Sequence, residues 1–448
     1  MGSKIYISEF DSEARLRNKE SCTLPVIDIY GGANRLLMRG IDGLTLTMAE
    51  EGDIVVTAEK LPDAYLAYWQ SEICRAENYS PERKDAEGAL SIYEILAHDE
   101  KAEKMLRERS IVNYALVPGY YEMCRSLGIE SDEPELETVT LLNGKSYSNE
   151  LKERLGLPAA GIRIRSLDEY RKAVSRLLAE HGRVLIKDVM GVSGRGMLLI
   201  DSSGMAERLA DHFKKQLESG AKEPDFILEP MLDKDMDFSC LLRIDKSAGI
   251  ITDGYQKNRS KGFSYLGTEP LSAEELGLIL DSEYPNTVMQ IAGDMAGRGY
   301  HGFACIDSMI SEGQVVPLIE INPRMSLSRF NLVMQERLGI KCRLSYAEGR
   351  RAEDISAEKI LEMLDDEGIL YTTERGQGVI PLAPCTWDAP DAAGKRVRIY
   401  YLIAAGKQED YEEILASWLA HCSGSICAGR ITKKRAGEEG LRSRNNLP

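Results

Sequence analysis

The sequence predicts a multidomain protein of mixed α/β and α+β class. Its 448 residues allow two to four domains, at roughly 100–200 residues per domain. Short apolar strands alternate with helices over residues 1–140, as in an α/β domain. Residues 141–335 then carry a strand–glycine loop–strand pattern and a tight hairpin, and residues 336–448 form a smaller α+β region. We therefore expect three domains with these boundaries.

Four elements are expected in the first domain, followed by an acidic surface. Apolar runs predict strands at 25–30 and 53–57, and helical periodicity predicts helices at 63–73 and 90–107. The stretch 122–137 carries six acids against one base, which is typical of a solvated surface before a domain boundary near residue 138.

The second and third domains contain clearer start and stop signals. Helices at 148–155 and 168–181 each end at a glycine. Strands are expected at 183–187, 197–200, 226–229, 238–244, 303–310 and 315–321. A turn at Glu312 and Gly313 joins the last two strands. The third domain is expected to contain a helix at 356–366, strands at 378–382 and 396–404, and a helix at 409–420.

Composition and charge exclude several classes of protein. Apolar residues make up 43% and charged residues 29%, which is ordinary for a globular chain. The formal charge of −16 disfavours nucleic acid and anionic lipid as partners. We find no signal-peptide h-region at the start and no apolar run of about 20 residues, so we expect a cytoplasmic protein that acts on small molecules.

Cysteine and histidine usage argues against a disulfide framework and a zinc site. The nine cysteines are scattered through apolar runs without a C-x-x-C pair, which predicts buried, reduced thiols. The five histidines lack metal-ligand spacing.

The predicted hairpin carries a group of oxygen donors. Glu320 and Asn322 are two residues apart on one strand, so their side chains share a face. Asp307 lies 13 residues upstream, within cross-strand reach once the hairpin forms. Two carboxylates and one amide are a ligand set that Mg²⁺ uses beside nucleotide phosphates. The alternative is a solvated hairpin face, but Glu320 interrupts an otherwise apolar run, where an acid needs a partner.

Three further residues fit a nucleotide site but also have ordinary interpretations. Lys187 ends an apolar strand before the glycine loop 191–196, whose backbone could approach phosphate oxygens. The loop is neither a Walker A motif nor a Rossmann fingerprint, and it also fits a flexible hairpin loop. Glu229 interrupts an apolar strand, and Lys145 precedes a helix; alone they fit a strand end and a surface lysine.

The order of these features resembles the ATP-grasp ligases over residues 141–335. The 13-residue gap and the Glu-x-Asn spacing are the most specific parts of the match. The stretches 52–56 and 66–68 resemble the preATP-grasp domain of pheganomycin-type peptide ligases. This resemblance implies a Rossmann-like preATP-grasp domain (1–140), a lid-side subdomain (141–228), a metal-binding subdomain (229–335) and a C-terminal α+β region with a basic tail (336–448).

The resemblance also implies a role for each motif residue, with ATP and Mg²⁺ as cofactors. The implied roles are Lys145 and Lys187 at the α/β-phosphates, Ser193, Gly194 and Gly196 in a loop over the phosphates, Glu229 and the Leu232 backbone at adenine, Asp237 at ribose, Asp307, Glu320 and Asn322 on Mg²⁺, and Arg324 at the reacting carboxylate. Cys305 stands where many members carry arginine, and Asp237 is displaced by one residue from the family position. Arg243 is a second candidate for holding an anion, or else a solvent-side arginine.

The implied reaction is activation of a carboxylate, such as that of an amino acid, as an acyl phosphate. An amine acceptor would give an amide or peptide bond, in secondary-metabolite biosynthesis. The alternative acceptor is the thiol of an acyl carrier protein, which the basic stretch 430–444 could attract; a solubilising terminus explains that stretch equally. A regulatory nucleotide-binding protein and a kinase remain as other classes. The basic run 254–267 is expected to be a mobile lid or an ordinary loop, and a homodimer is one possible assembly.

Overall fold

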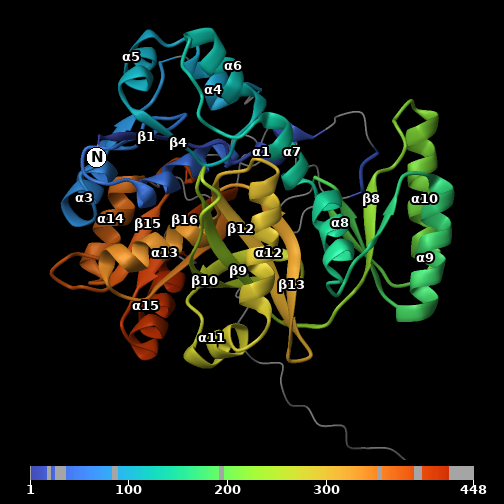
Figure 1. Ribbon diagram of the computed structural model, residues 1–448. Helices are drawn as coiled ribbons and strands as arrows, with labels where there is room; N and C mark the ends of the chain where they lie inside the picture. The colour runs from blue at the N-terminus through green and yellow to red at the C-terminus, as the bar shows by residue number, and fades with distance from the viewer. Residues whose placement is uncertain are drawn as a thin grey trace, which may run out of the picture.

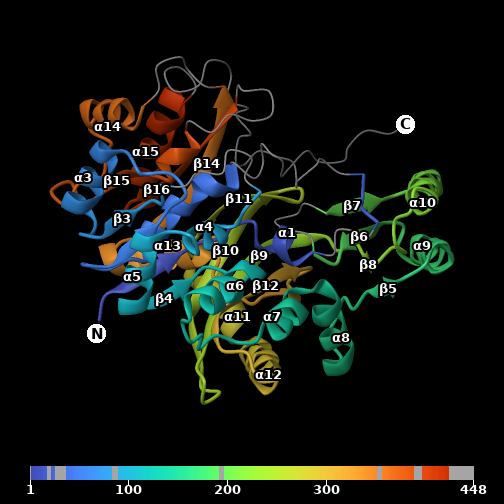
Figure 2. The same cartoon turned by 90° about the horizontal axis from the view of Figure 1, so that it is seen from above.

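The protein is built on three β-sheets, which Figures 1 and 2 show from two directions. The computed structural model describes residues 2–17, 22–25, 37–82, 89–190, 196–350, 356–387 and 396–422. The predicted strand at 25–30 lies almost wholly outside these residues. Among the described residues, no helix is long and apolar enough to cross a membrane, and the eight cysteines are all free.

The N-terminal sheet is parallel, with the strand order β3-β2-β1-β4. Its strands are β1 Lys4–Ile7, β2 Ile54–Val56, β3 Glu77–Tyr79 and β4 Ser110–Asn113. β2 confirms the predicted strand at 53–57, whereas β1 was not predicted because four residues give too little pattern. In this order the chain reverses direction between β1 and β4, so the segments after both strands meet at one edge.

Short helices surround this sheet. They are α1 Ser12–Leu16, η1 Ile41–Met48, α3 Asp63–Glu72, α4 Ile92–Leu96, α5 Glu100–Glu108 and α6 Pro118–Leu127. The single helix predicted at 90–107 is wrong, because the chain forms two. Ser91 caps α4 in a capping box, and Asp99 accepts backbone hydrogen bonds at the start of α5, so each segment has its own N-terminal signal.

The second sheet forms the green lobe at the right of Figure 1. Its order is β5-β8-β6-β7, all antiparallel, with β5 Ile162–Ile164, β6 Val184–Asp188, β7 Met197–Ile200 and β8 Phe226–Pro230. Helices α9 Leu167–His181 and α10 Ser203–Glu218 pack on it through a core that includes Phe213 and Phe226. The predicted strands are confirmed, and α10 was not predicted.

The third sheet has eight strands in the order β13-β12-β9-β10-β11-β14-β16-β15. These are β9 Lys234–Ile244, β10 Ile250–Lys261, β11 Ser264–Glu269, β12 Gly302–Ser311, β13 Gln314–Asn322, β14 Cys342–Arg350, β15 Gly378–Leu382 and β16 Arg396–Ala404. The predicted strands at 378–382 and 396–404 are confirmed. Since β14 pairs with β11, the C-terminal strands extend the sheet that contains the β12–β13 hairpin.

The basic run 254–267 is not a lid. It lies in β10 and β11, where Lys257 pairs with Glu269 and Arg259 with Gly267 in an antiparallel ladder. The Lys257 ammonium is 2.6 Å from a Glu275 carboxylate oxygen, and Arg259 contacts the Tyr411 hydroxyl. Backbone pairing and these contacts hold the segment within the sheet.

One face of the third sheet is covered by apolar packing, which turns the polar residues to the other face. The remaining helices are α7 Leu136–Asn143, α8 Lys145–Leu155, α11 Ala273–Leu280, α12 Tyr284–Gly297, α13 Leu327–Leu338, α14 Ala357–Asp366 and α15 Gln408–His421. Phe238 and Ile306 pack with Val288 and Ile291 of α12 in one core. Period-two alternation therefore places Ser239 and Asp307, which are register partners, on the opposite face.

Candidate functional site

The β12–β13 hairpin places three oxygen-bearing side chains together. Glu312 and Gly313 both have positive φ, at 50° and 73°, as a tight two-residue hairpin turn requires. The resulting register pairs Asp307 directly with Glu320, and Cys305 with Asn322. The cross-strand position predicted for Asp307 and Glu320 is confirmed.

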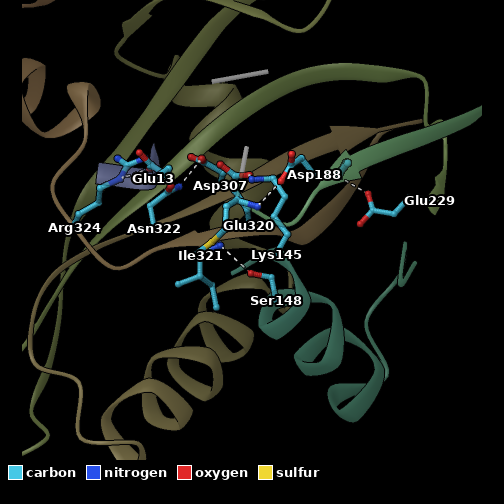
Figure 3. Close-up of polar contacts among 12 residues, drawn as sticks. Glu13, Lys145, Ser148, Asp188, Glu229, Asp307, Glu320, Ile321, Asn322 and Arg324 are labelled. Atoms are coloured by element: carbon cyan, nitrogen blue, oxygen red, sulfur yellow. Dashed lines mark hydrogen bonds and ion pairs between the residues drawn. The ribbon is translucent and has the colours of Figure 1, made fainter. Parts of the chain in front are cut away.

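Asp307 is held by hydrogen bonds, and Glu320 is held by a lysine (Figure 3). The Ser239 hydroxyl donates to Asp307 Oδ1 at 2.6 Å, and the Asn322 amide donates to Asp307 Oδ2 at 2.9 Å. Lys145 Nζ lies 2.7 Å from Glu320 Oε2. Burial and the charge of Glu320 raise the pKa of Asp307 to about 6. Burial opposes ionisation of Glu320 too, but Lys145 outweighs it and lowers the pKa of Glu320.

This donor set fits a hard divalent cation. Among the described residues, no group of three or more histidine, cysteine, aspartate or glutamate side chains forms a metal cluster. The hairpin instead offers two carboxylates and an amide oxygen, which Mg²⁺ accepts when phosphate oxygens and water complete its shell. The raised pKa of Asp307 shows that the two adjacent carboxylates lack positive charge, which a cation would supply.

A second buried cluster joins two lysines to one glutamate. Lys152 Nζ lies 2.9 Å from Glu229 Oε1, and Lys187 Nζ binds the other oxygen, Oε2. All three side chains are less than 10% exposed. Burial opposes the charge on Glu229, but the two ammonium groups lower its pKa to about 2. The Glu229 carboxylate, expected at an adenine edge, thus lies between two cations.

Close backbone packing holds Glu229 in this position. A Cβ atom added at Gly161 would lie 2.6 Å from Glu229 Cγ and 2.8 Å from the Leu228 carbonyl oxygen. Asn149 fixes the Gly161 backbone on both sides, accepting from its N–H at 2.6 Å and donating to its carbonyl at 3.0 Å. Only glycine fits this contact without displacing the glutamate.

Lys152 was missed, although the sequence carries a signal for it. Lys145, Ser148, Asn149 and Lys152 occupy positions i, i+3, i+4 and i+7 of α8, and all four are buried. A polar stripe at helical spacing that starts from a candidate phosphate-binding lysine indicates a helix face turned into a polar site. Ser148 also accepts a hydrogen bond from the Ile321 N–H at 3.1 Å, which joins α8 to the strand that carries Glu320.

Arg324 extends the cluster toward the N-terminal domain. Its guanidinium donates to Asn322 Oδ1 at 3.0 Å and, through Nε and Nη2, to Glu13 Oε1 at 2.9 and 2.6 Å. Burial alone would lower the pKa of Arg324, but Glu13 and Tyr114 outweigh it and raise that pKa. Figure 3 shows Glu13, Arg324, Asn322, Asp307 and Glu320 near one another.

The same N-terminal segment also contacts the lid-side sheet. Arg17 Nη1 lies 2.6 Å from Asp188 Oδ2, one residue after Lys187, and both side chains are at most 10% exposed. Glu13 and Arg17 are four residues apart, so one short helix reaches both Arg324 and the end of β6. Sequence spacing could not reveal either contact, because about 310 and 170 residues separate the partners.

The other predicted site residues are spread along β8, β9 and the glycine loop. Asp237 lies on β9 and accepts hydrogen bonds from Lys234 and, at 2.8 Å, from Ser260. Leu232 lies in the connection between β8 and β9. Arg243 is half exposed and pairs with Asp253 at 2.7 Å, four residues along β9 from Ser239.

Part of the predicted nucleotide loop can be placed. The Gly196 carbonyl accepts a hydrogen bond from the Asp188 N–H at 2.7 Å. Ser193, Gly194 and the basic stretch 430–444 lie outside the described residues.

Comparisons with known proteins identify the fold. No family model and no curated protein matches the chain. N5-carboxyaminoimidazole synthetase from Staphylococcus aureus aligns over 93% of this chain and 97% of its own, with a TM-score of 0.51 and 13% identity. Biotin carboxylase from Campylobacter jejuni, solved as a β-γ-ATP complex, aligns over 86% and 88%, with a TM-score of 0.53 and 12% identity.

A third solved structure extends the same likeness. The biotin carboxylase domain of the Hydrogenobacter thermophilus 2-oxoglutarate carboxylase, solved with MgADP, ADP and bicarbonate, aligns over 86% of this chain and 87% of its own, with a TM-score of 0.51 and 12% identity. These structures have the ATP-grasp fold, which confirms the predicted fold class. At identities this low the likeness establishes the fold alone, so the activity has to be inferred from the residues.

Proposed function

We propose that this chain is an ATP- and Mg²⁺-dependent ligase that activates a substrate carboxylate and joins it to an amine. The observation that carries the proposal is the joined cluster of Lys145, Glu320, Asp307, Asn322 and Arg324 on one face of the sheet. It combines a cation-binding oxygen set with a fixed guanidinium, inside a fold whose solved examples include complexes with ATP or ADP.

The proposed reaction has two steps, and neither needs a nucleophile from the protein. A carboxylate oxygen of the substrate attacks the γ-phosphorus of ATP, the bond to the β-phosphate oxygen breaks, and ADP leaves. The amine nitrogen then attacks the acyl carbon, the bond to phosphate oxygen breaks, and phosphate leaves with one proton from the nitrogen. Positioning and charge stabilisation supply most of the rate enhancement in such phosphoryl transfers.

The two clusters suggest a division of labour among the cationic side chains. Lys145 and Lys187 would bind the α- and β-phosphates, with Gly196 and the Ser193–Gly194 segment closing over them. Asp307, Glu320 and Asn322 would hold Mg²⁺, which neutralises charge that develops on the transferred phosphoryl group. Glu229, positioned by Lys152, would orient Lys187, while the Leu232 backbone and Asp237 would contact adenine and ribose.

Arg324 is the residue we assign to the acyl group. A guanidinium is a permanent, planar, forked donor that suits a carboxylate, an acyl phosphate or a tetrahedral oxyanion. Arg324 is buried and oriented by two acceptors, Glu13 and Asn322, so it is preorganised for an anion. Arg243 is a weaker candidate, since it is half exposed and already paired with Asp253.

The acceptor and the biological setting rest on the resemblance to pheganomycin-type peptide ligases. That resemblance favours an amino acid as the carboxylate donor and a peptide or amide product in secondary metabolism. A carrier-protein thiol is the alternative acceptor. No contact of the described residues favours it, since the basic stretch that suggested it lies outside them.

The test is carboxylate-dependent ADP release by the purified chain. Incubation with Mg-ATP and pools of amino acids, with and without amine acceptors, should release ADP and phosphate in equal amounts, and mass spectrometry should detect the amide product. Release that requires a holo-carrier protein would replace the amine proposal with the thiol alternative. No carboxylate-dependent release with any pool would contradict the proposal.

A further inference from the structure

A cavity of about 210 Å³ lies beside Arg324, on the side away from Asp307. Arg324 and Pro323 form one wall, the start of β12 at His301 and Phe303 forms another, and Asn113 and Glu133 come from the N-terminal domain. The volume is too small for a nucleotide and suits a small molecule or the end of a longer one.

Glu133 is the negative group of this cavity. Its Oε1 accepts a hydrogen bond from the Asn113 amide at 3.0 Å, and the Tyr93 hydroxyl in turn donates to Asn113 Oδ1 at 2.8 Å. This chain of hydrogen bonds fixes the carboxylate against the cavity. Burial raises the pKa of Glu133, and Asn113 offsets the increase only in part. Within the described part of the chain, Glu133 forms no ion pair, so its charge lacks a cationic partner.

The loop that carries Glu133 is itself fixed. The Glu133 N–H donates to the Ser131 hydroxyl at 3.3 Å, and the Tyr121 hydroxyl donates to the Pro134 carbonyl at 2.5 Å. His301 faces the same cavity, and burial together with the nearby Lys246 lowers its pKa, which keeps the imidazole neutral near pH 7. The cavity thus offers one fixed carboxylate and a neutral imidazole, with Arg324 as its only cationic wall residue.

We propose that this cavity is the acceptor subsite and that Glu133 binds the ammonium end of a primary amine. The inference rests on the proposed ligase function, because it places the acceptor next to the guanidinium assigned to the acyl group. A half-buried carboxylate without a counter-ion gains from a cationic ligand and gains nothing from a neutral thiol. The cavity therefore favours a small amine over a phosphopantetheine arm.

The first experiment measures binding to the intact chain, in the presence of ADP and MgCl₂. The probes are n-propylammonium and n-propanol, which have nearly the same shape and differ in charge, and ligand-observed NMR reports their affinities. We expect n-propylammonium to bind at least tenfold more tightly than n-propanol. E133Q should remove that difference, E133D should restore part of it, and E135Q, a matched change at an exposed acid on the same loop, should leave it intact.

The second experiment separates this inference from the ligase function. Hydroxylamine is largely neutral at neutral pH and traps acyl phosphates as hydroxamates, so it does not need a carboxylate for binding. E133Q should keep wild-type hydroxamate formation but raise the KM for n-propylamine at least tenfold. Equal affinity of the two probes for the wild type, or a wild-type KM in E133Q, overturns the inference. Failure of the wild type to form any hydroxamate contradicts the proposed function instead, while the NMR measurement still decides the subsite.

Discussion

Asp307 and Glu320 face each other across the β12–β13 hairpin, and their buried carboxylates do not share a counter-ion. Lys145 neutralises Glu320, whereas Asp307 is held only by hydrogen bonds from neutral groups: Ser239, Asn322 and, weakly, the Cys305 thiol. The pair therefore holds more negative charge than its immediate surroundings neutralise. A divalent cation with bound phosphate would change that balance, and the first two predictions follow from this relationship.

Removing either candidate ligand on β13 should abolish turnover without unfolding the protein. We expect Glu320→Gln and Asn322→Ala to lower carboxylate-dependent ADP formation by about 10²-fold or more, as for other preorganised charge-stabilising groups. Glu312→Asn, in the turn of the same hairpin, should keep full activity because asparagine tolerates positive φ. Steady-state ADP release and circular dichroism of the three variants check this, and wild-type turnover in both site variants would refute the metal assignment.

Mg²⁺ should stabilise the protein more at pH 7.5 than at pH 5. The pKa of Asp307 is raised to about 6, so the metal-free native state keeps a proton that the unfolded chain has lost between about pH 4 and 6. The contribution of Asp307 to metal-free stability therefore falls as pH rises through this window. Mg²⁺ competes with that proton, so its binding strengthens over the same window.

Thermal unfolding with and without MgCl₂ measures this effect, in the presence of a fixed ADP concentration. The Mg²⁺-induced rise in Tm should be small at pH 5 and larger at pH 7.5. Asp307→Asn should show little rise at either pH. A rise of the same size at both pH values in the wild type would mean that Asp307 does not bind the cation.

The sequence carried the hairpin cluster because its geometry is local. Asp307, Glu320 and Asn322 lie within 16 residues, and period-two alternation with a turn at Glu312 determines which side chains meet. Lys145 and Lys187 could be selected as candidates, but their partners could not. Glu229 binds Lys187 and Lys152 only because β8 lies beside β6, an order that the sequence pattern does not reveal.

Contacts between domains were beyond sequence reasoning for the same physical reason. Glu13 reaches Arg324 because α1 follows β1 at the edge where the N-terminal sheet meets the hairpin. Nothing in the residues around position 13 distinguishes this glutamate from a surface acid. The strands formed by 254–267 were mistaken for a lid because glycines and bases mask their alternation, and pairing with β9 and β14 decides their structure.

The Glu229 carboxylate should be essential to stability as well as to nucleotide binding. Glu229→Gln leaves two buried ammonium groups without a counter-ion, a change that typically costs about 3–5 kcal/mol. Adding Lys152→Met to Glu229→Gln should recover much of that loss. Urea unfolding of the single and double variants measures this; equal stability of wild type and Glu229→Gln would contradict it.

The same glutamate predicts a dependence of stability on acid pH. Its pKa is lowered to about 2 in the native state, below the ordinary value of 4.5. Its stabilising contribution is therefore complete above about pH 4.5 and is lost as pH falls toward 2. The wild type should lose stability more steeply over this range than the Glu229→Gln/Lys152→Met double variant, and parallel curves would show that the lysines do not control Glu229.

Glu13 should act on the reaction through Arg324. It accepts two of the guanidinium's hydrogen bonds, so Glu13→Gln should let Arg324 move away from the acyl group. A displacement of about 1 Å can cost about 10²-fold in rate, and we expect kcat to fall by that order while the KM for ATP changes little. A merely structural role would instead lower stability and leave kcat per folded molecule unchanged.

A double-mutant cycle with Arg324→Lys tests this dependence. If Glu13 acts by orienting Arg324, its removal should matter little once the forked guanidinium is gone, so the two losses should be far from additive. Arg17→Gln serves as the matched control on the same short helix, because Arg17 binds Asp188 and not Arg324. Its effect should fall mainly on the KM for ATP, through the end of β6 that carries Lys187, and it should add to that of Arg324→Lys. Additive losses for Glu13 and Arg324 would show that the glutamate does not position the arginine.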